Sequence, residues 1–294
     1  MKKLALALAL MMLVLAAFGC AQPAAEAPVE EAPAAEAPAE EAPAEEAPAE
    51  ETPAEEAPAA DSDLAYIQEK GNMIIGYTVY EPMNYTDENG VFTGFDTELA
   101  TLVCEKLGVE PVFQEIDWNT KEVELNGKTI DCIWNGMTLD ADREANMACT
   151  KPYVKNAQVV VMKADAEYTD TSSLIGKTVA AEIGSAGEST IQADENLAQA
   201  NYVGKSVQTE CLLEVKAGTA DAAVLDLTLA KAMVGEGTDY ADLTIVDELA
   251  VENYGVGFRQ GSDVRDAVNA IFDELVADGS MQALADKYSL ELAE

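Results

Sequence analysis

The chain has 294 residues and a formal net charge of −38 at pH 7, with 17 Lys and Arg against 55 Asp and Glu. A surface this acidic argues against nucleic acid or anionic lipid as a partner, because both would repel it. The chain contains no His, which excludes imidazole-dependent catalytic triads and His-ligated metal sites. We expect neither a metal ion nor an organic cofactor.

Residues 1–20 have the layout of a secretory signal peptide. Two lysines precede an apolar run over residues 4–18, which is too short and too one-sided for a membrane span. The run leads into Ala17-Phe18-Gly19-Cys20. This ending resembles a bacterial lipobox, although Ala17 stands where Leu is usual, and it predicts that Cys20 is lipidated. The alternative is an ordinary signal peptide with an incidental cysteine.

Residues 21–60 repeat Glu-Ala-Pro and Glu-Glu-Ala-Pro, with twelve Glu and no Lys or Arg. Such a segment has little to bury, and its prolines block long helices. Polyproline stretches and self-repulsion favour an extended, disordered spacer that could reach about 120 Å at ~3.1 Å per residue. The alternative is a low-complexity tail with no role.

The remaining residues, 61–294, alternate short apolar strands with amphipathic helices. The first predicted strand is 73–76. Asp96 is then expected to cap a helix over 97–107 that ends at Gly108. The apolar positions of this helix fall on one face, and they are Leu99, Leu102, Val103 and Leu107.

Six further strands and a late helix follow. The predicted strands are one beginning at 111–113, then 130–134, 159–162, 178–181, 222–225 and 244–246. Asp263 is expected to cap the late helix, which ends at Asp278-Gly279. Its predicted inward residues are Val264, Ala267, Val268, Ile271, Leu275 and Val276. This alternation indicates an α/β protein with mostly parallel sheets, in which ligands bind at the carboxyl ends of the strands.

Six segments in register carry a resemblance to a known family. They are Gly76-Tyr77-Thr78-Val79-Tyr80-Glu81-Pro82, then 87–90 with Gly94-Phe95-Asp96, 130–143, Gly176-Lys177-Thr178-Val179, 220–226, and Tyr254-Gly255-Val256-Gly257-Phe258-Arg259. Together they resemble the bacterial extracellular solute-binding proteins of family 3, which serve polar amino-acid ABC transporters. The resemblance spans nearly all of residues 64–290.

The resemblance implies a two-lobed periplasmic-binding-protein fold of type II, with the lobes joined by two crossing strands. Lobe 1 would comprise 61–156 and 253–294, and lobe 2 would comprise 157–252. The implied protein is a monomer that binds a free L-amino acid in the cleft between the lobes. It would act outside the cytoplasm, anchored through Cys20, and deliver the amino acid to an ABC permease with its ATPase.

The resemblance also implies how the α-carboxylate is held. A carboxylate suits a guanidinium with hydroxyl or backbone donors beside it. Arg143 matches the family's carboxylate-binding arginine, Thr138 matches a hydroxyl position, and Gly136 matches a position that offers backbone groups. Asn135 is expected to bind the ligand beside them. Without this register, Arg143 would be interpreted as a solvated loop arginine. In the loop Gly184-Ser185-Ala186-Gly187, Ser185 and Ala186 match backbone donors to the same carboxylate, although alone the loop is an ordinary turn.

Other positions match the residues that hold the ammonium group and the side chain of the amino acid. Asp226 matches the family's ammonium-binding aspartate; its alternative is a helix cap. Tyr80 and Trp118 match two aromatics that enclose the ligand side chain; their alternatives are a turn tyrosine and a core tryptophan. Trp134 lies in a strand and suits the core. Glu182 matches a pocket position, where it would pair with a polar or basic side chain or else face solvent.

Four cysteines lie in the folded part, at 104, 132, 149 and 211. None forms a Cys-x-x-Cys pair, which argues against structural zinc. Cys104 matches a disulfide cysteine of some relatives, but Pro111 occupies its usual partner position. We expect Cys104 to pack as a small apolar residue, and the spacing leaves other disulfides open.

Two rival functions remain. The same fold supports secreted dehydratases, in which carboxylates such as Glu182 or Asp226 would serve as acid or base. An Arg-plus-Asp pair for a zwitterion argues against an enzyme. The second rival is an amino-acid sensor, which would normally add a transmembrane segment or signalling domain that the sequence does not show after lobe 1.

Lipidation of Cys20 predicts a change in where the protein is found. The Cys20→Ser protein should be released into the medium or periplasm and still bind an amino acid, because the lipid is expected to be its only attachment. Fractionation of cells that express either form measures this. Retention of the variant with the membrane would show that the assignment is wrong.

Overall fold

A continuous twisted sheet forms the centre of the computed structural model, which describes residues 62–293. Its strand order is β4-β1-β5-β11-β7-β10-β8-β9, and β6 (Met147–Cys149) pairs with β11 outside this path. The predicted signal peptide over 1–20, with its lipidation site at Cys20, and the predicted spacer over 21–60 lie outside the described residues. Among the described residues, no helix has both the length and the apolar character to cross a bilayer.

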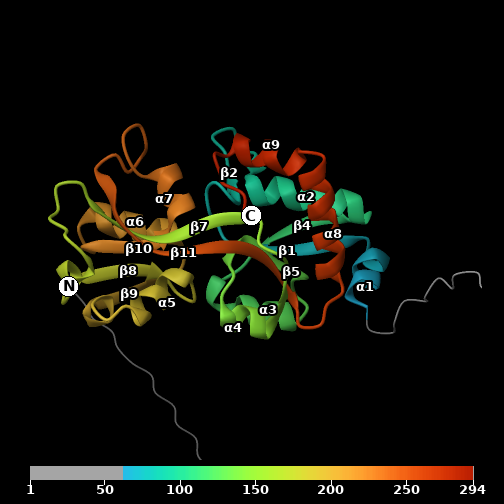
Figure 1. Ribbon diagram of the computed structural model, residues 1–294, viewed down its shortest axis with the longest axis horizontal. Coiled ribbons are helices and arrows are strands. Elements are labelled where there is room, and N and C mark those ends of the chain that lie inside the picture. Colours follow the sequence, from blue (N-terminus) through green and yellow to red (C-terminus); the bar gives the residue numbers. More distant parts are fainter. Residues whose placement is uncertain (1–61, 294) are drawn as a thin grey trace, which may run out of the picture. The chain divides into compact units, whose positions relative to one another are not determined.

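One half of the sheet is parallel and belongs to the blue, green and red part of the ribbon in Figure 1. It contains β1 (Asn72–Tyr77), β4 (Glu110–Glu115) and β5 (Cys132–Thr138). Residues Ile75 and Cys132 are register partners. The helices of this half are α1 (Asp63–Lys70), α2 (Phe95–Leu107), α3 (Lys121–Asn126), α4 (Ala141–Asn146), α8 (Val264–Ala277) and α9 (Ser280–Lys287).

The other half repeats the parallel pattern in the yellow and orange part of the chain (Figure 1). It contains β8 (Thr178–Glu182), β9 (Asn201–Lys205) and β10 (Ala222–Asp226). Its helices are α5 (Ala186–Ala193), α6 (Gln208–Ala217) and α7 (Leu227–Met233). Strand β8 pairs with both of its neighbours, so the carboxyl ends of all three strands point the same way.

Two long antiparallel strands join the halves. They are β7 (Val154–Lys163) and β11 (Leu243–Arg259), and both run across the middle of the molecule (Figure 1). The predicted lobe boundaries, at 156/157 and 252/253, fall inside these strands and remain predictions. Of these two strands, the sequence predicted only the apolar stretches 159–162 and 244–246. The polar residues elsewhere in β7 and β11 do not follow the pattern of a buried strand.

The predicted helix caps need correction. Helix α2 begins at Phe95 after Gly94, so Asp96 lies inside the helix and does not cap it. Its carboxylate is buried and accepts the backbone N–H of Gly136 at 2.6 Å. Asp263 does occupy the N-cap position of α8, but its side chain makes no bond to that helix. It accepts the N–H of Leu64 at 2.9 Å instead, in the first turn of α1, whose N-cap is Ser62.

The sequence also missed several small elements and one inward residue. Val276 is exposed, whereas Phe272, one turn earlier in α8, is buried. Strands β6 and β9 were not predicted, nor was the hairpin of β2 (Tyr85–Thr86) and β3 (Phe92–Thr93). These strands are short or largely exposed, so apolar periodicity does not mark them.

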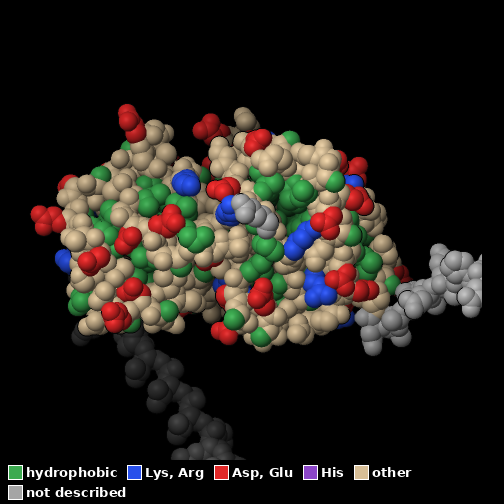
Figure 2. Space-filling model, viewed as in Figure 1, with side chains coloured by type: hydrophobic (Ala, Val, Ile, Leu, Met, Phe, Trp, Pro, Cys, Tyr) green, Lys and Arg blue, Asp and Glu red, His purple; other side chains and the backbone are tan. Residues whose placement is uncertain are grey.

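The cysteines and the charged surface complete the fold. Cys104, Cys132, Cys149 and Cys211 are all free thiols. Cys104 is fully buried inside α2, as expected of a small apolar residue. Figure 2 shows Asp and Glu side chains over much of the visible face, with fewer Lys and Arg among them, in keeping with the acidic composition.

Candidate functional site

A buried pocket lies where β5, β8 and β10 end. Its lining contains all ten predicted binding residues together with Gln208, and these are Tyr80, Trp118, Asn135, Gly136, Thr138, Arg143, Glu182, Ser185, Ala186 and Asp226. Both halves of the sheet contribute to it. The placement agrees with the rule that α/β folds bind ligands at the carboxyl ends of their strands.

Arg143 supplies a buried cation on one side of the pocket. It lies in α4, which begins after Asp140, and the Asp140 carboxylate accepts the backbone N–H of Arg143 at 2.8 Å. Its guanidinium donates to the carbonyl of Thr138 at 2.8 Å and to the carbonyl of Gly184, in the other half, at 3.3 Å. With 6% of its surface exposed, Arg143 is not a solvated loop arginine.

Asn135 and Gly136 shape the wall of the pocket more than they offer free groups. The side chain of Asn135 accepts from the N–H and hydroxyl of Thr78 and donates to Asn84 and to the Thr78 carbonyl. The N–H of Gly136 is already donated to Asp96, whose pKa burial raises to about 7. Gly136 has φ +55°, and a Cβ there would lie 2.8 Å from the Tyr80 ring, so glycine is required.

Asp226 supplies an acidic group on the opposite side. It stands at the end of β10 and directly before α7, but its carboxylate makes no bond to that helix, so it is not a side-chain cap. It accepts from Asn156 at 2.7 Å, from Gln158 at 2.6 Å and from Gln208. Burial raises its pKa. Three amide donors therefore fix its orientation.

Two aromatic residues close the pocket. Tyr80 is buried, and its hydroxyl bonds with those of Thr228 and Tyr254. Trp118 begins a short 3₁₀ helix (Trp118–Thr120), and Lys121 Nζ lies 4.8 Å from its ring centroid. Trp118 also packs in an apolar cluster, so it serves core and pocket alike. Trp134 is fully buried and belongs to the core, as predicted.

The loop between β8 and α5 brings backbone donors to the pocket. Ser185 caps α5, since its hydroxyl accepts the N–H of Glu188 at 3.1 Å. The first N–H groups of a helix have no carbonyl partner within that helix. A Cβ on Gly187 would lie 2.7 Å from the carbonyl of Val224, so a glycine lets α5 pack closely on β10.

Burial destabilises the charged forms of Glu182 and Lys121. Glu182 ends β8 with 3% of its surface exposed, and its Oε1 has no hydrogen-bond partner. Burial, followed by the nearby Asp226 charge, raises its pKa to about 8. Lys121 Nζ donates to the carbonyls of Trp118 at 3.2 Å and Gly184 at 3.0 Å, and burial lowers its pKa to about 8. The burial excludes a Glu182 that simply faces solvent.

Sequence reasoning missed six polar residues around this pocket, and they are Lys121, Asn156, Gln158, Gln208, Glu252 and Tyr254. A signal was present for two of them. Asn156 and Gln158 alternate along a strand whose continuation is apolar, which places both on one face. That face is the one that meets Asp226.

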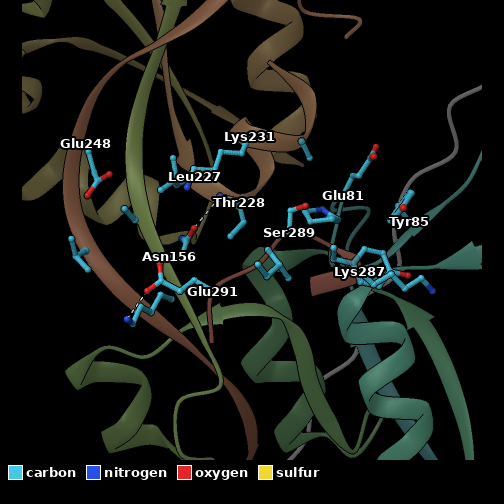
Figure 3. A pocket seen from close by; sticks show the side chains of 17 residues that line it. Glu81, Tyr85, Asn156, Leu227, Thr228, Lys231, Glu248, Lys287, Ser289 and Glu291 are labelled. Atoms are coloured by element: carbon cyan, nitrogen blue, oxygen red, sulfur yellow. Dashed lines mark hydrogen bonds and ion pairs between the residues drawn. The ribbon is translucent and has the colours of Figure 1, made fainter. Parts of the chain in front are cut away.

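A larger pocket is lined by Asn156 and Thr228 among others (Figure 3). Its charged residues are half-buried or exposed, among them Lys231, Glu248 and Lys287. Charges that keep their contact with water need no ligand to compensate them. The smaller pocket, with its buried charges, is therefore the better candidate.

Known proteins similar to this chain include two amino-acid-binding proteins. The chain is 26% identical over 226 residues to the arginine-binding extracellular protein ArtP of Bacillus subtilis, which covers 74% of this chain and 86% of ArtP. It is 27% identical over 231 residues to the L-cystine-binding protein TcyJ of Escherichia coli, which covers 76% of this chain and 84% of TcyJ.

Solved structures share the fold. A mutant of ArgBP from T. maritima matches with a TM-score of 0.71 and 31% identity, covering 77% of this chain and 98% of that one. AncCDT-1, an ancestral amino acid-binding protein described as a precursor of cyclohexadienyl dehydratase, matches with a TM-score of 0.70 and 27% identity over 77% and 99% of the two chains. The fold is thus the two-lobed type II fold of periplasmic amino-acid-binding proteins. The family model for these proteins matches residues 73–291, and the chain belongs to the bacterial extracellular solute-binding proteins, family 3.

Proposed function

We propose that this protein is the extracytoplasmic substrate-binding protein of an amino-acid ABC importer, and that it holds one free L-amino acid in the pocket described above. One observation carries the proposal. A buried guanidinium, Arg143, and a buried carboxylate, Asp226, line the same pocket from opposite halves of the sheet. A zwitterion carries the two charges that match them.

Arg143 binds the α-carboxylate. Its guanidinium is fixed by the Thr138 carbonyl and by Asp140, whose carboxylate lies 3.3 Å from Nε. The N–H groups at the start of α5 add donors, whereas the single hydrogen of the Thr138 hydroxyl is donated to Glu252. An anion at a helix N-terminus is further stabilised by the helix dipole.

Asp226 binds the α-ammonium. Its three amide donors hold the carboxylate in place before the amino acid enters. Such preorganisation lowers the conformational entropy lost on binding. The ammonium in turn supplies the positive charge that a buried carboxylate requires.

The side chain of the amino acid extends between Tyr80 and Trp118 toward Glu182. An unpaired oxygen on a buried carboxylate favours a ligand that donates hydrogen bonds or carries positive charge there. The names of ArtP and ArgBP indicate arginine binding in similar proteins. We therefore infer a polar or basic amino acid, with the basic class preferred.

Closure of the two halves accompanies binding. In the closed arrangement the Gly184 carbonyl accepts from Lys121 and from Arg143, which lie in the other half. An amino acid that bridges Arg143 and Asp226 binds tightly only to this form. That difference in affinity is what allows a ligand to shift a hinge equilibrium.

The predicted lipid anchor and spacer bear on where the protein delivers its amino acid. A lipid on Cys20 and the spacer over 21–60 would hold the binding domain at the outer face of the cytoplasmic membrane or in the periplasm. There it would act as a monomer and pass the amino acid to an ABC permease with its ATPase. A dehydratase on the same fold is the rival, and it would return an altered product where a binding protein returns the amino acid unchanged.

Stabilisation by amino acids is the first expected outcome. A ligand that binds only the folded state stabilises it by about 2.7 kcal/mol at a hundredfold excess over Kd. Thermal melts of the purified protein with each of the common L-amino acids should show a clear rise for a few of them, basic ones included. A melting temperature that no amino acid moves would count strongly against a binding function.

Arg143→Ala and Asp226→Ala test the zwitterion pair. Each charged hydrogen bond contributes about 1.5–3 kcal/mol, and loss of one partner leaves a ligand charge buried and unpaired. Each variant should therefore bind at least about a hundredfold more weakly in isothermal titration, at ~1.4 kcal/mol per decade. Melts without amino acid serve as the control for folding. An Asp226→Ala protein with wild-type affinity would exclude this mechanism.

Glu182→Gln tests the side-chain end through pH. The folded pKa of Glu182 is about 8, above its ordinary 4.5, so between these values the folded state keeps a proton that the unfolded state has lost. Raising the pH through this window therefore lowers wild-type stability. Between pH 5 and pH 8.5 the free energy of unfolding of Glu182→Gln should rise relative to that of the wild type, by on the order of 3 kcal/mol. The exposed Glu195→Gln is the control. If stability changed with pH in the same way in the wild type and in Glu182→Gln, the raised pKa of Glu182 would be refuted.

A further inference from the structure

A second carboxylate stands beside Asp226. Strand β7 lies between β10 and β11 in the sheet. Gln158 on β7 is the register partner of Asp226 on β10, and Asn156 on β7 is the partner of Glu252 on β11. Residues two apart on a strand share a face, and so do direct cross-strand partners. The register thus places two carboxylates and two amides on one face.

The two amides hold both carboxylates at once. Asn156 Nδ2 donates to Asp226 Oδ1 at 2.7 Å and to Glu252 Oε1 at 2.6 Å. Gln158 Nε2 donates to the same two oxygens at 2.6 and 2.9 Å. Each side-chain amide nitrogen has two hydrogens, so both nitrogens give one to each carboxylate. The Thr228 N–H, 3.1 Å from Asn156 Oδ1, fixes the orientation of that amide.

Glu252 also reaches the wall of the pocket. Its Oε1 accepts the hydroxyl of Thr138 at 2.8 Å, and Thr138 and Asp226 both line the pocket. Asn156, Gln158, Asp226 and Glu252 come from three adjacent strands, and only Thr138 comes from β5. The pair of carboxylates therefore does not depend on closure of the two halves.

We infer that Asp226 and Glu252 together form the ammonium site, that they share one proton in the absence of an amino acid, and that the entering ammonium replaces this proton. Before binding, the pair holds one proton and one negative charge. After binding, both carboxylates are ionised beside the ammonium, and the displaced proton passes to solvent. This inference rests on the proposed amino-acid binding.

The titratable groups around Asp226 and Glu252 support a single proton shared by these two carboxylates. Burial, followed by the Asp226 charge, raises the pKa of Glu252 to about 7, and burial raises the pKa of Asp226. Glu182 on β8 adds a further acid that interacts with Asp226. Tyr80 and Tyr254 stay neutral, since burial raises the pKa of each well above its ordinary value.

The nearest cations of the pocket, Arg143 and Lys121, have other partners. Arg143 is bonded to carbonyls and to Asp140, and Lys121 is bonded to carbonyls beside Glu182. With no cation bonded to it among residues 62–293, a pair of neighbouring, largely buried carboxylates cannot ionise fully at low cost. A protonated ammonium supplies the missing charge, so an amino acid that is acylated on its α-nitrogen should not bind.

Titration calorimetry with L-arginine tests the inference on the purified protein. Measurements in phosphate and in Tris, which differ in ionisation enthalpy, give the number of protons released per bound arginine. At pH 6 the wild type should release about one proton more than Glu252→Gln, and at pH 8.5 the difference should vanish. The affinity advantage of the wild type over Glu252→Gln should also fall about tenfold per pH unit below the pKa of the pair.

Glu248→Gln is the matched control. It changes an exposed glutamate on the same strand and should leave the proton count of the wild type unchanged. If another amino acid with a side chain that does not titrate near neutrality stabilises the protein better in the melts, it replaces arginine as the probe.

The outcomes separate the two proposals. Arginine binding with equal proton release by wild type and Glu252→Gln at pH 6 would overturn the shared proton but leave amino-acid binding intact. Absence of binding by all common amino acids would overturn both. Should Glu252→Gln fail to fold, the wild type alone decides, because an affinity for arginine that is constant from pH 5.5 to pH 8.5 contradicts the inference.

Discussion

Burial of charge that the protein does not fully pair is the constraint on which this site depends. Three carboxylates and two cations lie in or beside one pocket, largely removed from water. A buried ion is tolerated only where partners replace its hydration. Arg143 and Lys121 find carbonyls, and Asp226 finds amides, but Glu182 keeps an oxygen without a partner. The pocket therefore favours a ligand that brings its own positive charge.

The sheet explains how such a cluster can be held in place. Strands β5, β8 and β10 present the ends from which Thr138, Glu182 and Asp226 project, and the long strands β7 and β11 carry the polar residues between them. These two strands also join the halves, so two of the three amides that orient Asp226, those of Asn156 and Gln158, lie on a strand that the proposed closure would bend. Under that proposal, binding and closure share these two residues.

Much of the candidate site could be predicted from sequence because its residues stand in register with segments that resemble the family, and several of them follow apolar strands. Asp226 ends a buried run, and Arg143 follows the strand of Thr138 at a spacing typical of the family. Glu252 could not be found in this way, since its role depends on cross-strand register with Asn156, which no local pattern encodes. Lys121 resembles a surface lysine in sequence, and one of the two carbonyls that its buried ammonium contacts, that of Gly184, is distant in the chain. Asp96 and Asp263 showed cap patterns, but their partners, Gly136 and Leu64, come from other elements.

A crystal structure of the protein with bound L-arginine would test the central claim most directly. We expect the α-carboxylate within hydrogen-bond distance of the Arg143 guanidinium, the α-ammonium on the Asp226 carboxylate, and the side chain directed between Tyr80 and Trp118 toward Glu182. An arginine bound with its α-carboxylate and α-ammonium exchanged, or bound in the larger pocket beside Lys231 and Glu248, would contradict the account.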